Sequence, residues 1–518
     1  MDQTKIRQYP RMHLQRDSYT SLNGIWDIQI CHQDSLPEKE KFMPIMVPFL
    51  PGTKASLCEC KPQMNEVLWY QLQFAYLPNE QKTLLHFEAV YQSCTIFLNG
   101  VELFYHEGGY DAFYVDVSQT IKYQNLLLVK VVNQKTWSLP FQNEHPFMGI
   151  YGDVWLEDCG NHMIKDIIYQ WYPETQKLAI QLKGNFDQSL LTISSQSKVL
   201  YQGLTNDKKY EFIIQEPHLW SPDDPFLYDF HVKTEDDEVK SYIALRTVKT
   251  KIMYKDYHYF YLNQKKYWLN GIIDETWSDY TGPMYLSDEK MYQHLLLIKS
   301  LGYQAIYKRG MIERNRWFYF CDLIGLIVFQ DLSQQSLPFF SWHRKRSEDE
   351  QENFITEVNK LINGYAYHPS LVALILQNTG LAKCKQQEMM NRYSPKYLIN
   401  MDLYSSVNYT KKFDYKRLNF IKVGKIGYST KNNVMQKYQP QRQYMDKIDW
   451  YHAMANIFLN EVLTKLKKGY AGYFYERFQD SSNYNDGLCE KNEEELKIDK
   501  EFIQKWNARF RRMNNEGR

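Results

Sequence analysis

A continuous apolar run at residues 371–376, LVALIL, most restricts how this chain can fold. The polar residues Gln377, Asn378 and Thr379 follow it directly. An uninterrupted run of this kind is typical of a parallel strand that is covered on both faces. In α/β barrels the carboxyl ends of such strands carry the functional side chains. The pattern therefore predicts an α/β unit with a candidate site directly after this strand.

The length and charge of the chain restrict its organisation and its partners. A chain of 518 residues exceeds what one hydrophobic core usually supports, so we expect several domains. Its 62 basic and 61 acidic residues give a formal net charge of +1, which provides no field to attract nucleic acid or an anionic membrane. We expect a neutral ligand and no nucleic-acid partner.

The amino-terminal segment MDQTKIRQYPRMHLQRD lacks the apolar core of a signal peptide. No later window approaches the roughly 18 uninterrupted apolar residues of a membrane span. These features predict a cytoplasmic protein without a membrane segment. The eight cysteines are scattered, and Cys58 and Cys60 have no second pair at zinc-site spacing. We therefore expect free thiols, no metal site and no cofactor.

The pattern of secondary structure changes along the chain. Residues 22–157 carry short alternating strands, such as LLHFEAV and CTIFLNG, and the Asn99-Gly100 pair is a strong hairpin signal. A second run of short strands covers residues 161–248. From Tyr261 onward, strands alternate with helices, as expected for a parallel sheet. The sequence therefore predicts two β-sandwich regions followed by an α/β region.

Several boundaries in the α/β region have local signals. Ser287 is expected to cap a helix that continues to Leu301, and a second helix is expected at residues 314–323, ended by Gly325. Ser347 and Glu350 form a capping box ahead of a third helix. The segments YWLNGIID, YQAIYKR and LIVFQD are predicted to be the strands that precede the run at 371–376.

A family resemblance extends over nearly the whole chain. The stretches YPRMHLQRDSYTSLNGIWDIQI, LWYQLQF, GIYGDVWLE, RGMIERNRWFYFCDLIGLIVFQD and YHPSLVALILQNTG resemble glycoside hydrolase family two, the β-galactosidase and β-glucuronidase family. This resemblance implies a multidomain β plus α/β architecture. It implies a jelly-roll sugar-binding-like sandwich at residues 1–160, an immunoglobulin-like sandwich at 161–250, and a (β/α)8 TIM-type barrel at 251–518.

The resemblance also implies where two catalytic glutamates would lie. The acid/base position falls on Thr379, and the nucleophile position falls on Lys425 within VGKIGY. Retaining glycosidases need two carboxyl groups about 5 to 5.5 Å apart. A threonine hydroxyl does not donate protons near neutral pH, and a lysine ammonium repels an oxocarbenium-like transition state. The catalytic residues are therefore unknown.

The spacing of these two positions is short. Only 46 residues separate Thr379 from Lys425, whereas three barrel steps of about 30 residues each would need closer to 80. The second half of the barrel is therefore expected to be abbreviated.

Other side chains are expected near the carboxyl ends of the barrel strands. The candidates for a substrate pocket are Asp274, Trp277, Arg309, Asp331, Asn378, Glu476 and Asp480. For the acidic candidates, to which Glu275 and Asp402 belong, ligand hydrogen bonding or a structural ion pair is favoured over recruited catalysis. His368 precedes its strand and is expected to be a structural hydrogen-bonding residue.

Three functions remain open. The favoured one is a family-two-like protein of carbohydrate metabolism that has lost retaining hydrolysis and binds, at most, a β-glycoside or oligosaccharide. The second is an active β-glycosidase that uses repositioned carboxylates, with Glu476 and either Asp402 or Asp274 as candidates. The third is a non-catalytic scaffold that binds carbohydrate or protein. The resemblance also makes a homo-oligomer possible.

Overall fold

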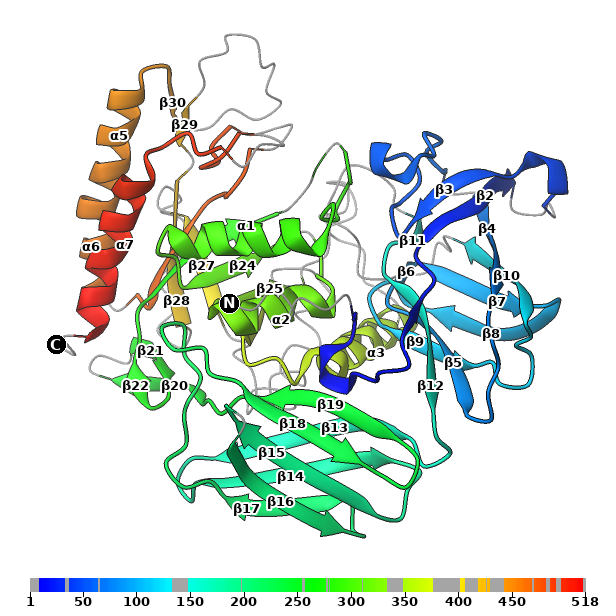
Figure 1. The fold of residues 1–518 in the computed structure, drawn as a ribbon. Coiled ribbons are helices and arrows are strands. Elements are labelled where there is room, and N and C mark those ends of the chain that lie inside the picture. Colours follow the sequence, from blue (N-terminus) through cyan, green and yellow to red (C-terminus); the bar gives the residue numbers. More distant parts are fainter. Residues whose placement is uncertain are drawn as a thin grey trace.

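The structure of the chain is a computed structural model. It describes residues 9–515 except 33–36, 64–65, 133–147, 197, 254–256, 276–277, 279, 310, 333–347, 376–400, 406–417, 425, 429–441, 468–469, 481–484 and 491–494. Figure 1 shows two β units, coloured blue to green, beside a third unit in which strands and helices alternate. Within this described part, no helix is long and apolar enough to span a membrane.

Two antiparallel sheets form the amino-terminal β unit. The strands of the smaller sheet have the order β1 (Thr20–Ser21), β12 (Val154–Cys159), β5 (Lys82–Phe87), β9 (Phe113–Asp116). The strands of the larger sheet have the order β3 (Met43–Val47), β2 (Gly24–His32), β4 (Glu66–Ala75), β10 (Gln124–Val132), β7 (Ser93–Leu98), β8 (Val101–Glu107). Trp26 and Val129 of the larger sheet share one buried cluster with Phe87 and Leu156 of the smaller sheet. The sheets therefore pack face to face, as predicted for a β-sandwich.

Short elements complete this unit. Strands β6 (Val90–Tyr91) and β11 (Gly149–Ile150) pair with each other, and short 3₁₀ turns lie at Met12–Leu14, Lys39–Lys41 and Lys54–Ser56.

The hairpin predicted at Asn99-Gly100 is confirmed. This pair of residues joins β7 to β8, and Leu98 is paired with Val101. Both turn residues have positive φ, 53° at Asn99 and 84° at Gly100. A two-residue turn with positive φ at both positions matches the twist of the flanking strands, and the Asn-Gly pair tolerates this conformation best.

The second β unit also consists of two antiparallel sheets. Their strand orders are β13 (Ile164–Tyr172), β14 (Lys177–Gly184), β17 (Lys209–Ile213), and β16 (Lys198–Thr205), β15 (Ser189–Ser195), β18 (Tyr228–Lys233), β19 (Glu238–Ile243). Leu178 and Ile180 of the first sheet lie in one buried cluster with Ile193 and Phe230 of the second. This arrangement agrees with the second predicted sandwich.

A mostly parallel sheet forms the third unit. Its strands are β20 (Val248–Met253), β21 (Tyr257–Leu262), β22 (Lys265–Lys266), β23 (Leu269–Asp274), β24 (Ala305–Lys308), β25 (Ile327–Asp331), β26 (Leu371–Ile375), β27 (Met401–Ser405), β28 (Leu418–Val423) and β31 (Gly472–Tyr475). The parallel pairings run β27, β28, β31, β23, β24, β25, β26. Strand β20 pairs antiparallel with β21, and the expected domain boundary at residues 250–251 falls within β20.

Helices connect and flank these strands (Figure 1). They are α1 (Asp288–Ser300), α2 (Asn315–Ile324), α3 (Glu348–Tyr365), α5 (Lys447–Asn456), a π-helical turn (Ile457–Val462), α6 (Leu463–Leu466) and α7 (Lys500–Asn515). Two short strands, β29 (Ile426–Tyr428) and β30 (Arg442–Tyr444), pair with each other. The predicted cap of the first helix is confirmed, since the Ser287 side chain accepts a hydrogen bond from the Lys290 backbone N–H. Gly325 ends α2 with a φ of 79°, as predicted. The proposed capping residue Ser347 lies outside the described residues.

Three phenylalanines show that the parallel sheet is strongly curved. Phe329 lies on β25, Phe420 on β28 and Phe474 on β31, and their ring centroids are 5.2 to 5.5 Å apart. Strands β25 and β28 are not neighbours in the order of pairing. Their rings can meet only because the sheet bends around a common interior, which these side chains fill.

Buried polar contacts join the three units. Arg16 donates to Asp237 of the second unit at 2.8 Å and to Glu157 of the first at 3.0 Å. Trp220 of the second unit donates its Nε1–H to the backbone oxygen of Asp322 in α2 at 2.8 Å. These contacts join the first β unit to the second, and the second to α2 of the third unit.

Candidate functional site

Charged side chains gather where the parallel strands end. Asp274, Lys308 and Asp331 are the last residues of β23, β24 and β25, and Glu476 directly follows β31. Because these strands are parallel, their carboxyl ends lie at one edge of the sheet, which we call the carboxyl edge. The four residues are between 0% and 6% exposed. The predicted candidates Asp274, Asp331 and Glu476 are thus brought to the same edge.

Lys308 lies between two carboxylates. Its Nζ is 2.8 Å from Asp274 Oδ2 and 2.6 Å from Glu313 Oε1. Burial alone would raise the pKa of Asp274, but attraction to Lys308 and to the His294 imidazole, whose Nε2 lies 3.7 Å from Asp274 Oδ1, outweighs burial and lowers it. Burial alone would lower the pKa of Lys308, whereas its two carboxylate neighbours raise it. Asp274 and Lys308 are therefore held in their charged forms.

A second charged cluster surrounds Glu275, the residue after β23. Arg309 and Arg477 each form an ion pair with the Glu275 carboxylate. Arg477 also donates from Nε to Asp486 Oδ1 at 2.9 Å. The predicted pocket residue Arg309 is therefore engaged in a charge network, with one carboxylate between two guanidinium groups.

Glu476 also has a basic partner. Lys422, on β28, places its Nζ 3.2 Å from Glu476 Oε1 and 3.1 Å from Oε2. Arg309 Nη2 lies 4.0 Å from the same carboxylate. Glu476 is 4% exposed, whereas the Lys422 side chain is 18% exposed, so the carboxylate is buried and its lysine partner is partly in contact with water.

Asp331 and Asp480 lie in different environments. Tyr307 donates its hydroxyl to Asp331 Oδ2 at 3.0 Å, and burial together with this carboxylate raises the pKa of Tyr307. Asp480 pairs with Lys497 at 2.8 Å and accepts the Gly487 backbone N–H at 2.8 Å. Burial raises the pKa of Asp480 despite the opposing effect of Lys497. These contacts connect Asp480 to Gly487 and Lys497.

Four predicted positions lie outside the described residues: Trp277, Asn378, Thr379 and Lys425. Asp402 lies within β27, which pairs with β28. His368 has the structural setting expected for it. Its Nδ1 is 2.6 Å from Asp322 Oδ2, and its side chain is fully buried before β26 begins.

Several charged partners at the carboxyl edge were missed by sequence reasoning. Glu313, Lys422, Arg477 and Asp486 each form an ion pair with another residue of the edge or its loops. A partial signal existed for two of them. Lys422 lies three residues before the nucleophile position at Lys425, and Arg477 directly follows the candidate Glu476.

The chemistry available at this edge follows from these pairings. A general acid in a glycosidase has its pKa raised toward the working pH, whereas the pKa of Asp274 is lowered. Asp274, Glu275 and Glu476 each lie within 4.0 Å of a lysine or arginine. Carboxylates paired in this way can accept hydrogen bonds from hydroxyl groups of a ligand. Among the described residues, no group of three or more His, Cys, Asp or Glu side chains could hold a metal ion.

Comparisons with known proteins agree on one family. The sequence model of glycosyl hydrolases family 2 matches residues 170–246. A β-galactosidase of Thermoanaerobacter pseudethanolicus is 25% identical over 319 residues, which cover 57% of this chain and 43% of that protein. A putative β-glucuronidase of Formosa agariphila is 26% identical over 339 residues, which cover 60% of this chain and 39% of that protein. The chain thus spans less than half the length of these relatives.

Solved structures show the same fold over a longer range. The β-D-glucuronidase of Dictyoglomus thermophilum aligns with a TM-score of 0.77 at 16% identity, over 96% of this chain and 98% of that one. A β-glucuronidase from an uncultured Clostridium also has a TM-score of 0.77, at 15% identity, over 97% of this chain and 99% of that one. The multidomain arrangement is therefore shared with these structures.

Proposed function

The chain belongs to glycosyl hydrolase family 2, and we propose that it keeps the scaffold of a β-galactosidase or β-glucuronidase without their retaining hydrolysis. The single observation behind this proposal is the pair of residues that the family resemblance aligns with the catalytic glutamates. Thr379 follows strand β26, and Lys425 follows strand β28. Neither side chain supplies a carboxyl group.

The missing groups have separate tasks. One carboxyl group protonates the leaving oxygen, and the other attacks the anomeric carbon to form a covalent intermediate. The Thr379 hydroxyl does not release a proton near neutral pH. The Lys425 ammonium would destabilise the positive charge that develops on the sugar ring in the transition state. Both halves of the double displacement would therefore lose their catalyst.

The charge pairing at the carboxyl edge supports this proposal. A substitute nucleophile would need an accessible carboxylate, and a substitute acid would need a raised pKa. Asp274 is buried against Lys308, and Glu476 is buried against Lys422. These pairs favour structural roles for the two carboxylates that an active enzyme would most readily recruit.

The proposed scaffold consists of a jelly-roll sandwich, an immunoglobulin-like sandwich and a TIM-type barrel, divided near residues 160 and 250. The phenylalanine contacts between β25, β28 and β31 support a closed barrel core. Strands β27 and β28 support an abbreviated second half of the barrel. They pair directly with each other, and only residues 406–417 connect them. A crossover of a dozen residues is near the minimum for parallel strands.

The remaining function is carbohydrate binding, with a β-glycoside or oligosaccharide as the ligand. The names of the related proteins support this class, since they are β-galactosidases and β-glucuronidases. The neutral overall charge and the hydrogen-bonding groups at the carboxyl edge are compatible with it.

A turnover assay tests the proposal. The purified protein is incubated with p-nitrophenyl β-galactoside and p-nitrophenyl β-glucuronide, and release of p-nitrophenol is followed. We expect no release above that of a heat-treated control. Clear turnover that disappears in Glu476→Gln or Asp274→Asn would instead support a working glycosidase with repositioned carboxylates.

A further inference from the structure

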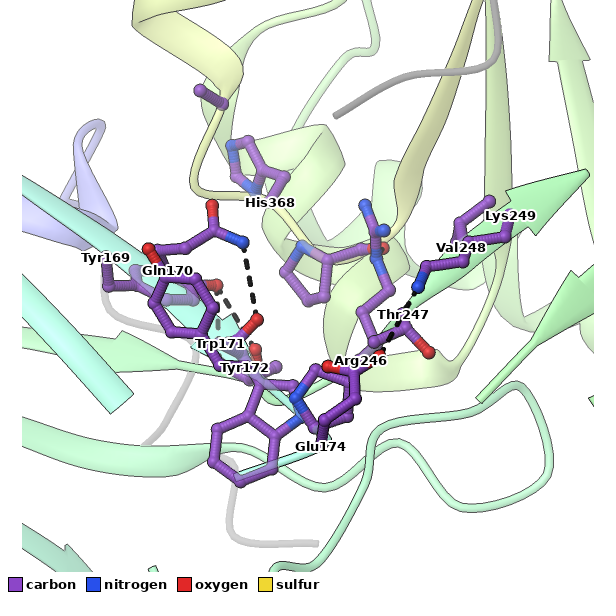
Figure 2. Close-up of a pocket in the computed structure, with 14 residues that line it drawn as sticks. Tyr169, Gln170, Trp171, Tyr172, Glu174, Arg246, Thr247, Val248, Lys249 and His368 are labelled. Carbon is purple, nitrogen blue, oxygen red and sulfur yellow. Dashed lines mark hydrogen bonds and ion pairs between the residues drawn. The ribbon is translucent and has the colours of Figure 1, made fainter. Parts of the chain in front are cut away.

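A pocket of about 250 Å³ lies between the second β unit and the parallel sheet. The end of β13 and the residues after it form one wall, the segment from Ala244 to Lys249 forms another, and the loop before β26 forms the third. Figure 2 shows these three segments around a common space and labels Tyr169 and Trp171 on one, Arg246 and Val248 on another, and His368 on the third.

The walls of this pocket are held together by hydrogen bonds. The Tyr169 hydroxyl donates to the backbone oxygen of Tyr367 at 3.1 Å. Arg246 donates to the backbone oxygens of Pro369 at 2.6 Å and Leu371 at 2.8 Å. Because these contacts join all three walls, the pocket is formed before any ligand arrives. A preformed pocket avoids the entropy cost of ordering its walls on binding.

The pocket is separate from the carboxyl edge. His368 and Pro369 precede β26, so this wall lies at the amino end of the parallel strands. Asp331, at the opposite end of neighbouring β25, belongs to the carboxyl edge. A five-residue strand is about 17 Å long at roughly 3.3 Å per residue. A molecule in the pocket therefore does not occupy the carboxyl edge.

The lining combines aromatic rings with groups that form hydrogen bonds. Tyr172 is 43% exposed, and Glu174 and Lys249 form an ion pair at 3.5 Å at the rim, where each side chain is more than half exposed. Trp171 belongs to the lining, and its buried Nε1–H has no hydrogen-bond partner among the described residues. A buried donor without an acceptor costs about 1–3 kcal/mol, so an acceptor that reaches it would be favoured.

We propose that this pocket is a second carbohydrate-binding site, which holds one residue of an oligosaccharide away from the carboxyl edge. Its volume is just below the roughly 300 Å³ of the smallest pockets for drug-sized molecules, which suits a single sugar ring of a longer chain. Flat aromatic rings can cover the apolar face of a sugar. The Glu174 carboxylate can accept from sugar hydroxyls, and the Lys249 ammonium can donate to them.

This inference rests on the proposed function for its ligand class, and the test separates the two. Saturation-transfer NMR is recorded with lactose, cellobiose and p-nitrophenyl β-glucuronide on the wild type and on Tyr172→Ala. Tyr123→Ala is the matched control, because Tyr123 is 63% exposed on the first β unit. Asp331→Asn reports on the carboxyl edge. The p-nitrophenol released in the same samples measures turnover independently.

We expect saturation transfer from the wild-type protein to at least one of the three sugars. The transfer that persists in Asp331→Asn should fall at least fivefold when Tyr172→Ala or Glu174→Gln is added, whereas Tyr123→Ala should leave the transfer unchanged. Absence of transfer from the wild-type protein to any of the three sugars would overturn the site. A signal that survives Tyr172→Ala but disappears in Asp331→Asn would also overturn it, because the sugar would then bind at the carboxyl edge. Release of p-nitrophenol that is equal in the wild type and in the pocket variants would instead contradict the proposed loss of hydrolysis.

Discussion

Lys422 and Glu476 lie at the ends of neighbouring parallel strands, with Lys422 Nζ 3.1 Å from Glu476 Oε2. They are 54 residues apart in the sequence, and the direct pairing of β28 with β31 brings them together. Glu476 would be the most direct replacement for a lost catalytic carboxylate, since it directly follows β31 at the carboxyl edge. Its pairing with Lys422 makes it part of the structure of that edge.

A double-mutant cycle measures this pairing. Lys422→Met removes the cation and leaves the Glu476 carboxylate with Arg309 at 4.0 Å, so we expect a loss of about 1–3 kcal/mol in the free energy of unfolding. Glu476→Gln alone should have a similar cost, and the double variant should cost less than the sum. Urea denaturation gives the three values. Strict additivity would show that the two groups do not interact.

Substitution of Lys308 should lower the free energy of unfolding more than substitution of an exposed lysine. It is fully buried between Asp274 and Glu313, so Lys308→Met leaves two carboxylates without their common cation. We expect a loss of about 3–5 kcal/mol in the free energy of unfolding. Lys505→Met is the control, because Lys505 is 79% exposed and its ion pair with Glu501 should contribute less than about 1 kcal/mol. Similar losses in both variants would contradict the structural role of Lys308.

Glu88 makes stability depend on pH. It is 4% exposed beside Asp153 at the junction between the first β unit and α2, and burial followed by repulsion from Asp153 raises its pKa to about 7. The folded state then binds more protons than the unfolded state between about pH 4.5 and 7. The free energy of unfolding should therefore fall as pH rises through that window.

The variant Glu88→Gln removes this dependence. Relative to the wild type, its free energy of unfolding should rise by about 2–3 kcal/mol between pH 4.5 and pH 8. Asp116→Asn, at an exposed position of β9, serves as the control. Parallel stability curves for the wild type and Glu88→Gln would show that Glu88 titrates normally in the folded protein.

Local features of this fold were predictable because a few adjacent residues determine them. Ser287 caps α1 through its own side chain, and Gly325 ends α2 because glycine accepts the left-handed conformation there. The Asn99-Gly100 hairpin depends on the same conformational freedom. The continuous apolar run was likewise sufficient to identify β26 as a buried strand.

The charge pairing of the candidate site was not predictable in the same way. Arg477 and Glu275 form an ion pair although 202 residues separate them, and this depends on the pairing of β31 with β23. The sequence placed the acidic residues near strand ends but gave no means to choose their partners. The second pocket was missed for a related reason, because three separate segments form its walls.

Arg16 should couple the two β units. It is 3% exposed, and its guanidinium group contacts both Asp237 and Glu157. Arg16→Leu leaves both carboxylates buried without this partner, so we expect a loss of about 3–5 kcal/mol in the free energy of unfolding. Arg16→Lys keeps the charge but not the two-pronged geometry, and it should lose less. Equal melting temperatures for Arg16→Leu and the wild type would contradict this role.

Covalent trapping tests the loss of retaining hydrolysis most directly. The protein is incubated with 2-deoxy-2-fluoro β-galactosyl and β-glucuronyl fluorides, which leave a stable glycosyl group on a nucleophilic carboxylate, and its intact mass is then measured. An active β-galactosidase treated in parallel provides the positive control. We predict that the mass of this protein stays unchanged with both reagents. A stoichiometric mass increase, mapped to Asp274, Asp402, Glu476 or any other carboxylate, would contradict the proposal that retaining catalysis has been lost.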